Sequence, residues 1–258
     1  MEFFDTHSHY NDEKFDEDRY EIIKDIYKSG VTKFITVGYN IQSSIKAIEI
    51  SKKIDYTYCA IGVSPNDVPE RKEEWNNMYK KLEELSDNKK IVAIGEIGLD
   101  YYWNKDNKEL QKKVFIDQIE LANKFNLPIV IHTRDAMNDT IDILQNKINV
   151  KKRGIFHCCP QNMELIKSAL DLGFYISFAG PITFKNSKSA HECVNLVPLD
   201  RLLIETDSPY LSPEPNRGKR NDSSNIHFIA EKVAEFKSIP VEMVAEQTYK
   251  NAKKIFSI

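Results

Sequence analysis

The chain has 258 residues, of which 41% are hydrophobic and 29% are charged, and its formal net charge is -3. This composition is typical of a globular protein, and the slight negative charge excludes a general electrostatic attraction to nucleic acid, so that any such contact must be local. No apolar run approaches the ~20 residues of a transmembrane helix, and the first residues lack the pattern of a secretory signal. The four cysteines include no CxxC pair, which suits a reducing compartment, so we expect a cytoplasmic protein without a membrane partner.

Short apolar segments recur along the chain, and each is apolar enough to be a strand buried on both faces. In chain order, we predict strands at 3–4, 33–38, 56–63, 90–100, 127–133, 154–159, 174–180 and 202–210. Apolar residues at helical spacing separate them. Two such stripes, which we expect to be ordinary core, are Trp75, Met78, Leu82 and Leu85, and then Ile226, Ile229, Ala230, Val233 and Phe236.

This alternation of strand and helix, repeated eight times over ~255 residues, predicts a (β/α)8 TIM-like barrel of the α/β class. A doubly wound open sheet is the alternative, but it usually has fewer strands, and no GxGxxG motif follows the first predicted strand. No linker, low-complexity segment or repeat divides the chain, so we expect residues 1–258 to form a single domain. The Pro-, Gly-, Asn- and Ser-rich stretch 212–225 would be the loop after the eighth strand.

Histidines and acids gather at the predicted carboxyl ends of the strands, where barrels of this kind place their active sites. Four of the six histidines lie there, and so many polar groups on one rim are costly unless something pairs them. Bound metal is the simplest partner, because imidazole and carboxylate suit zinc, manganese or magnesium. With the first three on one face of the first strand, the residues are Asp5, His7, His9, Glu96, His132, His157, Glu205 and Asp207.

Five short motifs occur in order along the chain: the HxH of "FDTHSH", then "GEIGLDYY", "IHTR", "FHC" and "ETDSPYL". The HxH motif is weak by itself, whereas the last motif is specific and the ordered set is more specific still. From "FDTHSH" to the C-terminal "YKNAKKIF", the chain resembles the TatD-type metal-dependent deoxyribonucleases, which belong to the amidohydrolase-like barrels. The resemblance implies a hydrolase that uses two divalent metal ions to cleave phosphodiester bonds of DNA, commonly as a 3′ to 5′ exonuclease.

The resemblance also implies two adjoining metal sites that share one carboxylate. It assigns the first ion to His7, His9, Glu96 and Asp207, and the second to Glu96, His132 and His157. Glu96 would be the bridging ligand, as expected where two ions share one group. Asp207 would also accept a proton from the attacking water, and Glu205 would orient one of the ligands.

The chain departs from the family pattern at Ser64, where relatives usually carry a histidine, with a second polar position at Asn66. Serine can donate a hydrogen bond but cannot act as an acid near neutral pH. We therefore expect intact metal binding with a slower or altered nuclease. Side chains expected to bind the phosphates or stack on the bases are Ser64, Arg134, Tyr210, Lys219 and Arg220, with at least one of Tyr101 and Tyr102 at the mouth of the site.

Cys158 follows a predicted ligand, but on a regular strand it would point away from His157, into the layer beneath the helices. We therefore expect Cys158 to be a structural thiol, whereas Cys159, which we expect in the following loop, stays unassigned. His191 and His227 lie on predicted helices and are expected to be structural.

Two alternatives to a nuclease remain open. One is an amide or ester hydrolase on the same barrel, acting on a cyclic amide or an aminoacyl ester. Barrels of that kind often place a carboxylated lysine where this chain has Glu96, which favours the nuclease. The other is a binding protein that keeps its metals without catalysis, although the complete ligand set argues against it. No feature of the sequence indicates an obligate protein partner.

Overall fold

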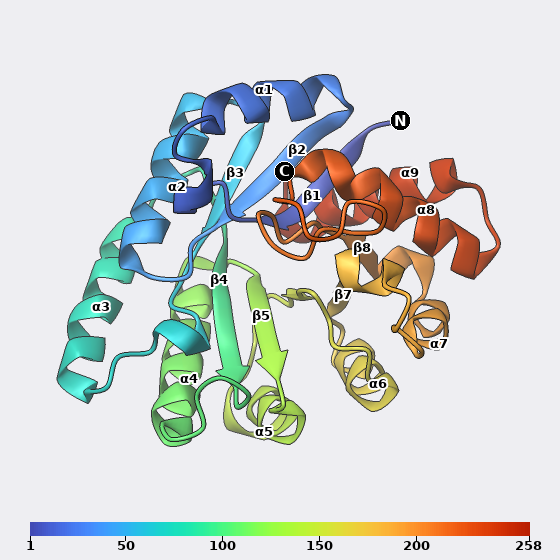
Figure 1. Ribbon diagram of the computed structural model, residues 1–258. Coiled ribbons are helices and arrows are strands. Elements are labelled where there is room, and N and C mark those ends of the chain that lie inside the picture. Colours follow the sequence, from blue (N-terminus) through green and yellow to red (C-terminus); the bar gives the residue numbers. More distant parts are fainter.

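The computed structural model describes residues 1–258, and a sheet of eight parallel strands lies at its centre (Figure 1). Neighbours in the sheet are neighbours along the chain, in the order β1 to β8. This order confirms the predicted (β/α)8 barrel, because a doubly wound sheet would reverse its strand order at a switch point. The strands are β1 Phe3–Ser8, β2 Val31–Val37, β3 Thr57–Ile61, β4 Ile91–Asp100, β5 Ile129–Arg134, β6 Ile155–Phe156, β7 Tyr175–Phe178 and β8 Leu202–Ile204.

A helix follows every strand and packs on the outside of the sheet, and a ninth helix, α9, follows α8 at the end of the chain. Polar caps begin two of these helices: the Asn40 side chain accepts from Ser43 N at 2.9 Å before α2, and Asn162 caps α6 in the same way. The helices are α1 Arg19–Lys28, α2 Ile41–Lys53, α3 Lys72–Leu85, α4 Lys108–Phe125, α5 Met137–Asp142, α6 Met163–Asp171, α7 Ala190–Leu196, α8 Ile226–Lys237 and α9 Val241–Phe256.

Each predicted strand overlaps an observed one, but β6 and β8 end earlier than their apolar patterns indicate. The predicted strand 154–159 stops at Phe156, and the predicted strand 202–210 stops at Ile204. Two residues just beyond these ends, Cys158 and Asp207, have φ angles of 36° and 56°. An extended strand cannot continue through the left-handed region, so the polar residues that follow lie on loops.

Apolar side chains form two layers, one outside and one inside the barrel. The outer layer joins the strands to the surrounding helices and includes the predicted core residues Trp75 and Leu82. The inner layer takes one or two side chains from every strand and ends on Ala252, Ile255 and Phe256 of α9. Helix α9 therefore closes the end of the barrel where the strands begin, which leaves the carboxyl ends of the strands as the open mouth.

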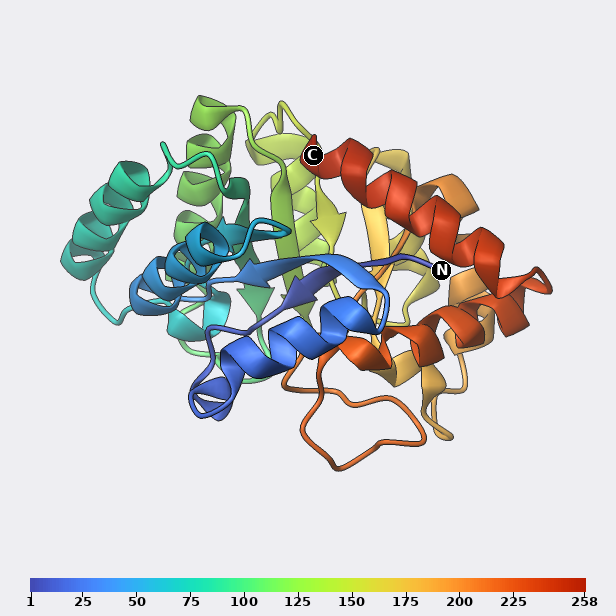
Figure 2. The ribbon, with the colours of Figure 1, turned by 90° about the horizontal axis from the view of Figure 1, so that it is seen from above.

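The seam between β8 and β1 is joined by the loop that follows β8. Asp207 N donates to His7 O at 2.9 Å, and His9 N donates to Ser208 O at 2.7 Å. The barrel is thus nearly closed at its mouth. Figure 2 shows the remainder of this loop (orange) projecting from the body of the molecule before the chain enters α8.

Strands β4 and β5 approach closely where Gly98 faces the backbone of His132. A Cβ atom on Gly98, whose φ is 141°, would lie 1.9 Å from His132 O. Only glycine fits such a position, so this residue sets the spacing of the two strands next to the mouth. None of the helices combines the length and the apolar character needed to cross a membrane.

Candidate metal centre

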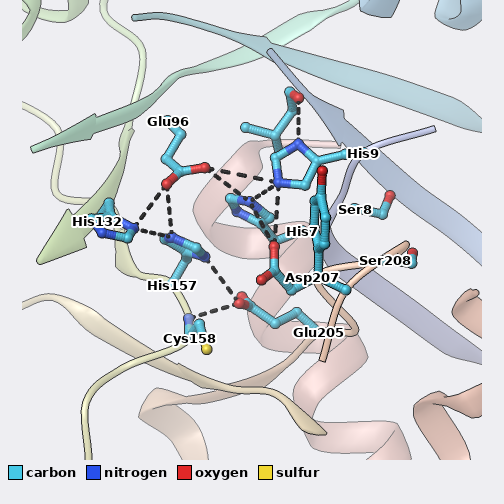
Figure 3. Close-up of polar contacts among 12 residues, drawn as sticks. His7, Ser8, His9, Glu96, His132, His157, Cys158, Glu205, Asp207 and Ser208 are labelled. Carbon is cyan, nitrogen blue, oxygen red and sulfur yellow. Dashed lines mark hydrogen bonds and ion pairs between the residues drawn. The ribbon is translucent and has the colours of Figure 1, made fainter. Parts of the chain in front are cut away.

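Six side chains from five different strands and their loops converge at the open mouth (Figure 3). Glu96 comes from the middle of β4, where its backbone N–H donates to Gly38 O. The other five lie at or just beyond strand ends, and most of the six are buried. The converging residues are His7, His9, Glu96, His132, His157 and Asp207.

Glu96 lies between two pairs of imidazoles, and each of its carboxylate oxygens faces one pair. Its Oε1 is 2.9 Å from His132 Nδ1 and 3.3 Å from His157 Nε2. Its Oε2 is 3.5 Å from His7 Nε2 and 3.8 Å from His9 Nε2. One carboxylate is therefore placed to serve two adjoining sites at the same time.

Asp207 completes the group around the histidines of β1. Its Oδ1 lies 3.2 Å from His9 Nε2 and 3.6 Å from His7 Nε2. The backbone hydrogen bond to His7 O fixes the residue in its left-handed conformation. Asn221 holds the same turn by donating from Nδ2 to Thr206 O and Tyr210 O at 2.9 and 2.7 Å. A strained residue held from several sides is typical of functional sites.

Acceptors around the cluster orient three of the imidazoles. His9 Nδ1 donates to Val37 O at 2.9 Å, which leaves Nε2 free to face the cluster. His157 Nδ1 lies 3.2 Å from Glu205 Oε1, and that oxygen also accepts from Cys158 N at 2.7 Å. Such contacts set the ring orientation and the tautomer of a ligating histidine.

Asp100 performs this role for His132, and the sequence reasoning did not single it out. His132 Nε2 lies 3.0 Å from Asp100 Oδ2, on the side of the ring opposite Glu96. Gln111 of α4 clamps the Asp100 backbone through Asp100 N and Asp100 O at 2.9 and 3.2 Å. The signal in the sequence was an acid four residues after Glu96, at the end of the same strand.

The electrostatic balance of the cluster rests on carboxylates and imidazoles alone, since Glu96 and Asp207 form ion pairs only with histidines. Burial by itself would raise the pKa of Glu96, but His157 and the other imidazoles hold that pKa well below its usual value. Burial would likewise lower the pKa of His157, whereas Glu96 and Glu205 raise it well above its usual value. The charged form of each group in the cluster is thus stabilised by its oppositely charged neighbours.

The donor set fits divalent metal ions. Nitrogen and carboxylate oxygen atoms lie within 4.8 Å of one another in the group His7, His9 and Asp207, and also in the group Glu96, His132 and His157. A third group of this kind joins His7, His157 and Glu205. Buried imidazoles and carboxylates without a lysine or arginine partner are the ligands that such ions use in proteins.

Two expectations about neighbouring residues are wrong. Asp5 does not join the cluster: its carboxylate accepts from Thr206 and Ser223, and a register shift between Asp5 and Ser8 interrupts the regular alternation of β1. Cys158 is not a core thiol, because its left-handed backbone turns it to line the cavity over the cluster. Cys159, which the alternation left open, packs in the outer core instead.

A cavity of about 930 Å³ opens over the cluster, and only some of the residues expected to contact a substrate line it. Ser64, Arg134 and Tyr210 line it. Lys219 and Arg220 do not, and Arg220 forms an ion pair with Asp18. Ser64 Oγ donates to Asp67 Oδ2 at 2.8 Å. Of the two expected tyrosines, Tyr101 is buried with its hydroxyl on Asp139, and Tyr102 is exposed.

A model of the TatD related DNase family matches residues 4–257. The chain is 43% identical over 258 residues to "Uncharacterized metal-dependent hydrolase YabD" of Bacillus subtilis, covering 99% of both chains. It is 38% identical over 261 residues to an "Uncharacterized metal-dependent hydrolase" of Buchnera aphidicola, covering 100% of this chain and 97% of that one. The crystal structure of YJJV, a TatD homolog from Escherichia coli K12, has a TM-score of 0.92 at 22% identity, covering 99% of this chain and 98% of that chain, which shows a shared fold.

We predict that Asp100→Asn weakens metal binding about 10- to 100-fold, the usual cost of losing a group that orients a ligand. The amide would keep Oδ1 for the backbone and turn its NH₂ toward His132 Nε2, which disfavours the tautomer that leaves Nδ1 free. Competition with a chelator of known affinity measures the change. Asp142→Asn, at an exposed carboxylate outside the cluster, is the matched control, and equal affinities for the two variants would contradict the role of Asp100.

We also predict that metal uptake releases protons at pH 7 and that the apparent affinity rises with pH. Burial alone would lower the pKa values of His9, His132 and His157, but their carboxylate neighbours raise them above the usual value. These rings therefore keep protons to a higher pH than free histidine and must lose them to bind an ion. Calorimetric titration with Mn²⁺ in buffers of different ionisation enthalpy counts the protons. His191→Gln, at an exposed histidine, should change nothing, and binding without proton release would refute the prediction.

Proposed function

Because this chain belongs to the TatD related DNase family and is a metal-dependent hydrolase, we propose that it cleaves the phosphodiester bonds of DNA in the cavity over Glu96. The observation that carries the proposal is the placement of the two Glu96 oxygens, each toward a different pair of imidazoles. A carboxylate shared between two ligand groups can hold two ions close enough to act together on one phosphodiester bond.

In this proposal, Glu96 would help to hold two ions. The first ion would be held with His7, His9 and Asp207, and the second with His132 and His157. Zinc, manganese and magnesium all suit these donors. Bound there, the ions would lower the pKa of the attacking water and offset the negative charge on the phosphoryl oxygens.

The residues of the chain would divide the remaining tasks. Burial would raise the pKa of Asp207, but His9 and the nearby imidazoles lower it, so the carboxylate is ionised near neutral pH and can accept a proton from the water. Arg134 forms no ion pair within the protein and lines the cavity, so its guanidinium is free to bind a phosphate. By its resemblance to the family, the protein would remove nucleotides from the 3′ end of a DNA strand.

The decisive experiment is a substrate panel with a paired variant. We expect the protein, loaded with Mg²⁺, Mn²⁺ or Zn²⁺, to shorten a DNA oligonucleotide from its 3′ end. Glu96→Gln should lose bound metal and about 100-fold or more in kcat, since both sites lose a charged ligand. Glu192→Gln, at an exposed acid on α7, should match the wild type. Cleavage of a cyclic amide or an aminoacyl ester with no action on DNA would replace the nuclease by the amide or ester hydrolase.

Ser64→His should raise kcat on DNA about tenfold or more, because the chain has no proton donor there and a general acid contributes roughly 10²–10⁴-fold. Asp67, which accepts from Ser64 Oγ, would raise the pKa of the new imidazole into the useful range. Metal content should stay the same, because Ser64 lies outside the ligand groups. Comparison with Ser64→Asn, which cannot transfer a proton, isolates the effect; a variant histidine without any gain would mean that another residue serves the leaving group.

A further inference from the structure

Trp103 stands in the cavity mouth with no packing role in the core. Its side chain is 68% exposed, whereas Trp75, the other tryptophan, is 1% exposed. Trp103 nevertheless lines the same cavity as His132 and Asp207. A large aromatic surface left in water loses the free energy that burial would supply, and such residues at a site mouth mark binding surfaces.

We propose that Trp103, Tyr102 and Arg134, together called the stacking platform, hold a base of the substrate beside the phosphodiester bond that is cleaved. The inference rests on the proposed function and adds a residue-level determinant of substrate binding to it. Every nucleobase presents a flat π face, and stacking on an aromatic ring is tolerant of base identity.

The three side chains of the platform support each other. The Arg134 guanidinium carbon lies 3.8 Å from the centre of the Tyr102 ring and 5.5 Å from that of Trp103. The two rings are perpendicular, with centres 4.8 Å apart. Because no carboxylate pairs with Arg134, its charge stays available for a phosphate. The platform therefore combines a free ring with a free cation, the pair of groups that a nucleotide needs.

The platform is tied to the candidate metal centre through Asp100. Asp100 Oδ1 accepts from Tyr102 N at 2.9 Å and from Trp103 N at 3.0 Å. Asp100 Oδ2 contacts His132 Nε2 at 3.0 Å. One carboxylate thus fixes the turn that carries the aromatic rings relative to a histidine of the cluster. A base on the platform would place its phosphate at a constant distance from the reacting groups.

The opposite wall of the cavity offers a second aromatic ring. Tyr210 is 41% exposed, donates its hydroxyl to Asp12 at 2.7 Å, and has Lys14 Nζ 4.2 Å from its ring centre. Asp67 and Asp135 also line the cavity, and their charges disfavour phosphate beside them. Besides any bound metal ions, Arg134 and the stacking rings therefore supply the attraction that draws a strand into the mouth.

The test compares Trp103→Ala and Trp103→Phe with the matched control Tyr27→Ala. Tyr27 is an exposed aromatic residue in the last turn of α1, at the end of the barrel opposite the mouth. Substrates are an oligothymidylate and an oligomer of abasic deoxyribose phosphate, a diester without a base or any other aromatic ring. On the oligothymidylate, Trp103→Ala should lower kcat/KM about 5- to 100-fold, Trp103→Phe should keep most of it, and Tyr27→Ala all of it. On the base-free diester, Tyr27→Ala should equal the wild type, and the loss of kcat/KM caused by Trp103→Ala should be several-fold smaller than on the oligothymidylate.

Binding is followed separately by tryptophan fluorescence of the metal-loaded protein, with an oligothymidylate whose 3′ linkages are slowly cleaved phosphorothioates. Since Trp75 is buried, quenching by the oligonucleotide reports Trp103, and it should vanish in both Trp103 variants. If the wild type cleaves DNA but Trp103→Ala behaves like Tyr27→Ala and no quenching occurs, the platform is refuted while the nuclease stands. If quenching occurs and neither diester is cleaved, the proposed nuclease fails while the platform is supported.

Discussion

A buried carboxylate surrounded by imidazoles is the constraint on which the rest of this structure depends. Glu96 is almost fully buried, and its neighbours are histidines instead of lysine or arginine. An isolated charge in such a place would be very costly. The negative charge of the cluster must be balanced by protons on the imidazoles or by bound metal ions. This need explains why so many histidines surround Glu96.

The barrel satisfies this need because it brings distant segments to one rim. Parallel strands all end on the same side, so residues from the first strand and from the loop after the last can meet. Short strands contribute as well: β6 and β8 end just before His157 and Asp207, which frees these residues to turn inward. Helix α9 closes the opposite end with Phe256 and its neighbours, so the polar rim does not weaken the apolar interior.

The surrounding contacts show how rigidly the cluster is held. Val37 O, Asp100 and Glu205 each fix one imidazole from behind. Asp100 extends the same control outward, because it also holds the turn at Trp103. In this way Asp100 links one histidine of the buried cluster to the turn at the exposed mouth, which would couple the placement of a substrate to the placement of the reacting groups.

Periodicity and residue chemistry were enough to predict the eight strands, their order and the gathering of histidines and acids at one rim, because apolar pattern reports burial and parallel strands share a direction. The assumption that side chains alternate between the two faces of a strand gave the wrong direction for Asp5 and Cys158. A register shift near Asp5 and the left-handed backbone of Cys158 change which way these side chains point. The sequence reasoning also missed Asp100 and Trp103. The role of Asp100 depends on its contact with the His132 ring, and that of Trp103 on the exposure of its side chain, and neither can be read from the sequence. Which atoms meet across the barrel depends on packing between segments far apart in the chain, as in the hydrogen bond from Thr206 N to Asp5, whose partners are 201 residues apart. Only the tertiary structure decides these contacts.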